Sequence, residues 1–185
     1  MSKDLTQVLA NYRDGKMVIV TDHEGRENEA DLVMAAEFAD QEKIAFMIRY
    51  TSGVICVALT ADRARELQLP QMVANNEDKK STAFTVSVDY KVGLTTGISA
   101  KERASTIVSL ASPTIMSSDL IRPGHVFPLV AHKNLLKSRL GHTEAAVALS
   151  MLTGRRLVVA LAELVNDDGS MMKGAEIKVF SESHG

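Results

Sequence analysis

The chain has 185 residues, a formal net charge of −2, charged side chains at 24% of positions and a single cysteine. This length and composition fit one domain with a core of its own, and no apolar run reaches the roughly 18 residues of a membrane-spanning helix. The lone Cys56 excludes an internal disulfide, and the lack of a basic block argues against a nucleic-acid partner. Since the N-terminus also lacks the apolar stretch of a signal peptide, we expect a cytoplasmic protein with a small-molecule partner.

Strand-like and helix-like segments alternate along the chain, so we expect a mixed α/β fold in one domain over residues 1–185. In the first part of the chain, a helix is predicted to end at Gly15, and a strand leads into a highly charged tract. The segments expected up to residue 67 are a helix at 5–13, strands at 17–20 and 32–38, a helix at 40–50, a strand at 53–60 and a helix at 61–67.

In the second part, the polar segment 74–82 predicts a loop and the alternating segment 83–90 a strand. Ser99 and Glu102 have capping-box spacing for a helix at 100–110. Pro128 suggests that a strand at 125–131 lies at a sheet edge or a strand end. The last elements expected are a buried helix at 143–152 that ends at Gly154, a core strand at 156–165 and a turn at 166–169.

The stretch Thr21–Val33, TDHEGRENEADLV, gathers ionisable side chains directly after a strand: Asp22, His23, Glu24, Arg26, Glu27, Glu29 and Asp31. On an extended backbone, the three acidic residues of RENEAD would share one face, opposite Arg26. Carboxylates on one face repel each other unless a cation compensates, and such an oxygen-rich site suits Mg²⁺. The alternative interpretation is a charged, solvated connection.

Two histidines stand at positions where proton or anion chemistry is possible. In RPGHVFPL, a Pro-Gly turn places His125 at the expected start of a strand, where it could shuttle a proton or serve a structural role. In SRLGHTEAA, His142 and Thr143 open the buried helix. A helix N-terminus attracts anions, and Arg139 just before it would add donors. Thr143 could instead be a simple N-cap.

Glu163 is the single acid within the apolar segment VVALAELV. A carboxylate there needs a partner or has a raised pKa, and both conditions are common in active sites. An exposed strand end is the alternative. Together the polar clusters predict an enzyme for a small anionic substrate that uses a divalent metal, a histidine and a carboxylate.

Five motifs carry a more specific resemblance. In order and spacing, DHEGRENEADL, TTGISAKER, RPGHVFPL, RLGHTEAAV and ELVNDDGSM resemble the motif set of the 3,4-dihydroxy-2-butanone 4-phosphate synthases of riboflavin biosynthesis. The similarity runs over nearly the whole chain. It implies an α+β fold, a mixed-sheet α/β sandwich, that works as a homodimer with active sites near the subunit interface.

The resemblance also implies roles for individual residues. Arg26, Glu27 and Asp31 match the family's substrate-binding loop, and Glu27 and His142 match its metal ligands for Mg²⁺ or Mn²⁺. The segment Arg139, Leu140, Gly141, His142 and Thr143 matches the part that contacts the phosphorylated substrate. His125 and Glu163 match positions regarded as essential for catalysis, and Asp31 is a further candidate acid or base.

The reaction implied is a lyase reaction that converts D-ribulose 5-phosphate to L-3,4-dihydroxy-2-butanone 4-phosphate and formate. Removal of a proton next to the ketone leaves an enediolate, whose charge a divalent cation can stabilise, and the later rearrangement needs several acids or bases. Two alternatives are another metal-dependent isomerase or lyase for sugar phosphates, and a non-catalytic binding protein that has kept the fold.

Overall fold

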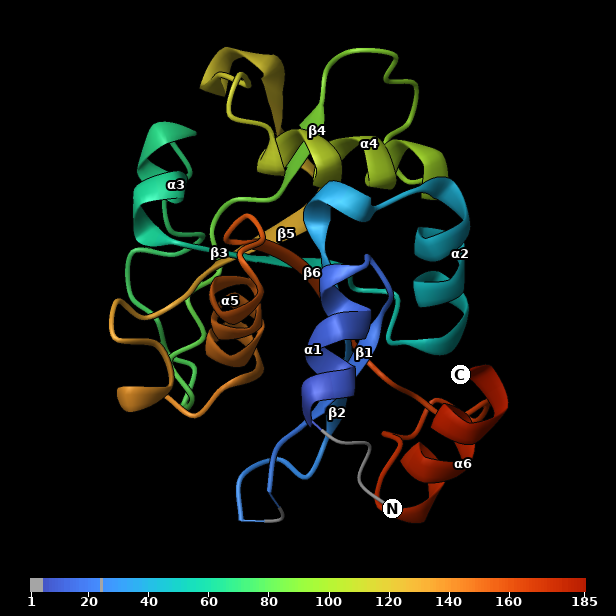
Figure 1. Ribbon diagram of the computed structural model, residues 1–185. Coiled ribbons are helices and arrows are strands. Elements are labelled where there is room, and N and C mark those ends of the chain that lie inside the picture. Colours follow the sequence, from blue (N-terminus) through green and yellow to red (C-terminus); the bar gives the residue numbers. More distant parts are fainter. Residues whose placement is uncertain (1–4, 24) are drawn as a thin grey trace.

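The computed structural model describes residues 5–23 and 25–185, so Glu24 of the charged tract lies outside the described residues. Within these residues, six strands form one mixed sheet in the order β1-β2-β6-β3-β5-β4 (Figure 1). The strands are β1 (Val18–Thr21), β2 (Ala30–Ala35), β3 (Cys56–Leu59), β4 (Val88–Tyr90), β5 (Leu120–Val130) and β6 (Val158–Glu163). The helices are α1 (Leu5–Arg13), α2 (Gln41–Tyr50), α3 (Ala61–Glu66), α4 (Ala100–Ala111), α5 (His142–Thr153) and α6 (Ala175–His184).

The two faces of the sheet carry separate hydrophobic cores. Along β2, Leu32 and Met34 belong to the core shared with α2 and α4, whereas Val33 and Ala35 belong to the core shared with α1 and α5. This division follows from the two-residue period of a strand, which sends alternate side chains to opposite faces. The expected mixed-sheet sandwich is therefore confirmed, with helices on both faces of the sheet (Figure 1).

The pairing of β2 with β6 fixes the place of two predicted site residues. The two strands are antiparallel, and Asp31 near the start of β2 pairs with Glu163 at the end of β6. On the other side of β6, Leu161 pairs with Cys56 at the start of β3. One end of the central strands therefore brings an acid from β2 and an acid from β6 side by side.

The expectation that Pro128 marks an edge strand or a strand end is wrong. β5 lies inside the sheet, parallel to β3 and antiparallel to β4. The amide of Phe127 donates to Ile55 on the β3 side, whereas the amide of Val130 donates to Ala83 on the other side. The missing N–H of Pro128 therefore faces the irregular 83–85 segment, whose Thr85 amide donates to the Pro128 carbonyl at 2.9 Å. A proline is tolerated there because that neighbour forms no continuous ladder.

Most other elements agree with the sequence analysis. Ser99 is the N-cap of α4, as expected, since its hydroxyl accepts from the Glu102 amide at 3.2 Å. The Glu102 carboxylate accepts from the Ser99 hydroxyl at 2.7 Å and from the Thr95 amide, and not from the Ser99 amide that a full capping box requires. α5 ends at Gly154, which has the expected left-handed conformation. The strand expected at 83–90 is reduced to β4, and α5 is buried mainly over its first turns, with Leu152 exposed. No described helix has the length and apolar character needed to cross a membrane.

Candidate active site

A pocket opens at the end of the sheet where β2 begins and β6 ends. It receives side chains from the β1–β2 loop, the start of α5 and the segment 82–84. Its lining consists of Arg26, Glu27, Glu29, Asp31, Cys56, Thr82, Phe84, Leu129, Arg139, His142, Thr143, Leu161 and Glu163. Seven of the residues predicted from the sequence therefore meet in one place, although they lie in three separate parts of the chain, 26–31, 139–143 and 163.

The centre of the pocket is a buried pair between β2 and α5. His142 Nδ1 lies 3.0 Å from Asp31 Oδ1, and both side chains are almost fully buried. The other ring nitrogen of His142, Nε2, is buried and has no hydrogen-bond partner within the described chain. Because an unpartnered buried nitrogen is costly, this atom is suited to bind a ligand.

The electrostatics of this pair reflect its acidic surroundings. Burial raises the pKa of the Asp31 carboxyl, and the neighbouring Glu163 and Glu27 add to the increase, while His142 opposes it. Burial alone would lower the pKa of His142, but the adjacent Asp31 raises it above the ordinary value for histidine. Burial also raises the pKa of Glu29, with contributions from Glu27 and Glu163. A pocket in which carboxylates raise each other's pKa favours a bound cation.

The acidic loop differs from the extended backbone that we expected. Residues 25–27 form a turn, and Asn28 has a positive φ of 54°, before β2 begins at Ala30. Asp22 holds this turn together. Its carboxylate accepts from the amide of Glu29 at 2.9 Å, the amide of Glu27 at 3.0 Å and the Arg26 guanidinium at 2.8 Å. The acids still reach one pocket, but through a turn centred on Asp22.

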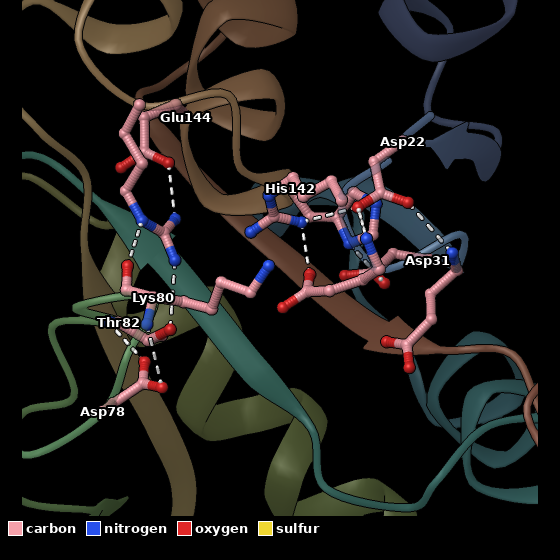
Figure 2. A network of polar contacts seen from close by, with 11 residues as sticks. Asp22, Asp31, Asp78, Lys80, Thr82, His142 and Glu144 are labelled. Carbon is pink, nitrogen blue, oxygen red and sulfur yellow. Dashed lines mark hydrogen bonds and ion pairs between the residues drawn. The ribbon is translucent and has the colours of Figure 1, made fainter. Parts of the chain in front are cut away.

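Arg139 lies at the opposite side of the pocket and makes three hydrogen bonds. Its guanidinium donates to the carboxylate of Glu144 at 2.7 Å, to the backbone carbonyl of Lys80 at 3.0 Å and to the Thr82 hydroxyl at 3.0 Å (Figure 2). Glu144 is itself buried and also accepts from the His132 amide. A Cβ added at Gly141 would meet the Arg139 guanidinium, so only glycine leaves room for this pair. Arg139 thus fastens the 78–82 segment to the start of α5.

His125 is the predicted catalytic residue that the fold keeps away from this pocket. It lies within β5, rather than at the start of a strand, and does not line the pocket. Its Nδ1 lies 2.7 Å from Asp89 Oδ2, and its amide donates to Asp89 Oδ1 at 2.9 Å. Gly97 of the TTGISAKER motif packs directly against this pair, with a φ of 86° that favours glycine.

The remaining predicted residues are placed as follows. Glu163 accepts a hydrogen bond from Ser52 at 2.7 Å. Gly141 precedes α5, and His142 and Thr143 form its first turn, as expected. Leu140 is 61% exposed and does not line the pocket.

Sequence reasoning missed several residues around the pocket. Asp22 belongs to the charged tract, but no local pattern indicates its place at the centre of the turn. Thr82 comes from the polar loop and Phe84 from the start of the expected strand, and neither segment carries a pattern that indicates a functional role. Cys56 lines the pocket, and burial raises the pKa of its thiol, so the thiol is held neutral. The single signal available beforehand was the density of polar residues in segment 74–82.

The pocket offers few protein ligands for a divalent cation. No group of three or more His, Cys, Asp and Glu side chains is arranged as a metal site anywhere in residues 5–23 and 25–185. Two protein ligands are nevertheless enough for Mg²⁺, which keeps several waters or substrate oxygens. The orphaned His142 Nε2 and the Glu27 carboxylate, which line the same pocket, are chemically suited to such a cation.

A mixed α/β sandwich with one pocket of acids, a histidine and guanidinium groups defines a class of protein that handles a small polar molecule with a cation. Comparison with known proteins specifies the class further. Residues 6–185 match the 3,4-dihydroxy-2-butanone 4-phosphate synthase family, and the chain belongs to that family. The family resemblance drawn from the five motifs is thereby confirmed.

Individual relatives support this assignment. The chain is 50% identical over 182 residues to 3,4-dihydroxy-2-butanone 4-phosphate synthase of Candida albicans, covering 98% of this chain and 89% of that protein. It is 49% identical to riboflavin biosynthesis protein RibBA of Salinispora arenicola over 97% of this chain, but spans 43% of that protein. A solved 3,4-dihydroxy-2-butanone 4-phosphate synthase in complex with two magnesium ions superimposes with a TM-score of 0.94 at 42% identity, covering 98% of this chain and 89% of that one.

Proposed function

We propose that this chain converts D-ribulose 5-phosphate to L-3,4-dihydroxy-2-butanone 4-phosphate and formate in riboflavin biosynthesis. The observation that carries the proposal is the meeting of Asp31, His142 and Glu163 with the acidic loop in one pocket of a chain that belongs to this family. The proposal also takes Arg26, Glu27, Asp31 and the segment 139–143 as substrate-binding residues. Formate release distinguishes this reaction from an isomerisation of the same sugar phosphate.

A divalent cation, Mg²⁺ or Mn²⁺, would be held by Glu27 and His142. When bound, it would stabilise negative charge that develops on the substrate oxygens. Asp31 keeps His142 oriented through its contact with Nδ1, which leaves Nε2 available as a ligand. Arg26 neutralises part of the charge of the acidic loop, because it pairs with both Asp22 and Glu27.

Glu163 is suited to move protons at the substrate. Its carboxylate lines the pocket, lies on the strand next to Asp31 and is oriented by the Ser52 hydroxyl. Asp31 is a second candidate, since burial raises its pKa and so favours its protonated form. The rearrangement and the loss of formate require proton transfers at adjacent carbons, and two acids on neighbouring strands could serve different carbons.

The position of His125 supports a homodimer. Within one chain His125 is fixed by Asp89 and does not line the pocket that holds Asp31 and Glu163. If His125 acts in catalysis, a two-fold partner would have to bring it to the pocket of the other subunit. Sedimentation should then show a dimer at assay concentration. We also propose a cytoplasmic location, which suits the free Cys56.

The proposal is tested by incubating the purified protein with ribulose 5-phosphate and Mg²⁺ and measuring formate. EDTA should abolish formate release, and added Mg²⁺ should restore it. Glu27→Gln and His142→Ala should each abolish turnover and calorimetric Mg²⁺ binding, while the circular dichroism spectrum is unchanged. Glu42→Gln, an exposed acid on α2, is the control. Near-normal turnover in either ligand variant would exclude the proposed pair.

A further inference from the structure

The pocket poses an electrostatic problem for the proposed substrate. Four carboxylates line it, from Glu27, Glu29, Asp31 and Glu163. A sugar phosphate carries close to two negative charges of its own, so it would be repelled unless cations compensate. A divalent metal near His142 would offset part of this charge at one end of the pocket. The phosphate end needs a positive group as well.

The two arginines that line the pocket are already paired with acids. Arg26 contacts both Asp22 and Glu27. Arg139 pairs with the buried Glu144 at 2.7 Å and makes further hydrogen bonds to the 78–82 segment. Each arginine therefore contributes little net positive charge to an incoming phosphate, although free N–H groups of Arg139 could still donate to it.

The backbone of Lys80 is held at the rim of this pocket. Arg139 donates to its carbonyl, and the Asp78 carboxylate accepts from the amide of Lys80 at 3.1 Å and from the amide of Thr82 at 2.8 Å. The Asn76 side chain closes the same turn through the Thr82 carbonyl at 3.0 Å. Thr82 lines the pocket, and Lys80 is two positions before it in the chain. This network therefore holds the backbone of Lys80 next to the pocket.

The Lys80 side chain extends into the space between the two polar networks. Figure 2 shows it leaving the 78–82 segment and pointing toward His142 and Asp31. Throughout the described residues, the Lys80 ammonium forms no ion pair and no hydrogen bond, in contrast to Arg26 and Arg139. Lys80 is thus an unpaired cation beside an acidic pocket, on a segment that Arg139 holds in place.

We infer that Lys80 binds the phosphate group of the substrate and is a specificity-determining residue for phosphorylated sugars. Besides its proposed contact with the substrate, Arg139 then also positions this segment, because it donates to the carbonyl of Lys80 and to the hydroxyl of Thr82. This inference rests on the proposed function of the pocket. Its recognition chemistry is a single ammonium group that meets a phosphate dianion at the solvent-facing side.

The test compares Lys80→Met with Lys79→Met, which removes the same charge from the adjacent position of the same loop. Lys80→Met should raise KM for ribulose 5-phosphate by about 10-fold, the lower end for a hydrogen bond to a charged group, and leave kcat within about threefold. It should weaken competitive inhibition by inorganic phosphate to a similar extent. Lys80→Arg should restore most of the wild-type KM and most of the phosphate inhibition. In Lys79→Met, both quantities should stay within about twofold of wild type.

Three results would overturn the inference: an unchanged KM and phosphate inhibition in Lys80→Met, an equal effect of Lys79→Met, or a fall in kcat without a change in KM. Lys80 is exposed, so folding should not be affected, and Lys80→Gln provides a second variant. Calorimetric binding of inorganic phosphate to wild type and Lys80→Met separates this inference from the proposed function. If wild type releases no formate, the proposed reaction fails, and phosphate binding still decides the role of Lys80.

Discussion

Asp22 gives the most direct test of how the acidic loop is held. Burial alone would raise the pKa of the Asp22 carboxyl. This effect is outweighed by hydrogen bonds from the Glu29 amide, the Arg26 guanidinium and the Glu27 amide, which lower the pKa from 3.8 to about 2. The side chain is 6% exposed, so solvent screens these contacts little. At about 1.4 kcal/mol per pKa unit, the shift corresponds to about 2 kcal/mol of stability.

The pH dependence of this contribution follows from the lowered pKa. The folded state keeps Asp22 ionised where the unfolded state has taken up a proton, so the stabilisation is complete well above pH 4 and is lost as pH falls through about 2. It should decrease to about 1 kcal/mol at pH 3. Asp22→Asn should therefore reduce the free energy of unfolding by about 2 kcal/mol at pH 7 and by about half as much at pH 3.

The assay is urea unfolding of wild type and Asp22→Asn at both pH values, together with formate release at pH 7. Because Asp22 does not line the pocket, its loss should act through the positions of Glu27 and Glu29, so we expect a higher Mg²⁺ requirement. Asp168→Asn is a matched control, since Asp168 also accepts from the backbone of a turn, away from the pocket. A variant as stable as wild type at pH 7, or a difference that is the same at both pH values, would refute the reasoning.

Two further predictions concern buried polar pairs. Tyr12 is buried against Ser150 at 2.6 Å, and burial raises its pKa to about 12, so the folded state should lose stability as pH rises above 10. The stability difference between wild type and Tyr12→Phe, measured by urea unfolding, should shift against wild type by about 1 kcal/mol from pH 8 to pH 11, and a constant difference would contradict this. Glu144→Gln should leave the Arg139 guanidinium without its buried carboxylate and cost about 2 kcal/mol in thermal or urea unfolding, with a raised KM. Unchanged stability and KM in that variant would show that the pair does not hold the loop.

The sequence predicted what depends on local patterns. Alternation and helical periodicity located the strands and helices, and Ser99, Glu102 and Gly154 marked helix ends that the structure confirms. The motif around His142 predicted the polar start of a buried helix for the same reason: backbone groups at a helix terminus leave a recognisable residue pattern.

What the sequence could not show depends on residues far apart in the chain. The edge position inferred from Pro128 failed because the side to which its missing N–H points depends on the neighbouring strands. The proposed role of Lys80 depends on its contact with Arg139, 59 residues away along the chain. No local sequence pattern predicts a contact between residues so far apart. The separation of His125 from the pocket likewise follows from its position along β5, four residues before Leu129, which does line the pocket, and not from the RPGHVFPL motif.

The first turn of α5 connects the two polar networks of the pocket. His142 and Glu144 are two residues apart, and successive helical residues are rotated by about 100°, so their side chains leave the axis about 200° apart. His142 accordingly reaches Asp31 on β2, while Glu144 reaches Arg139 and through it the segment that carries Lys80 (Figure 2). One helical turn therefore sets the spacing between the proposed metal ligands and the proposed phosphate-binding cation. If both proposed roles hold, this spacing would select the length of the substrate, because a sugar phosphate would have to reach both ends at once.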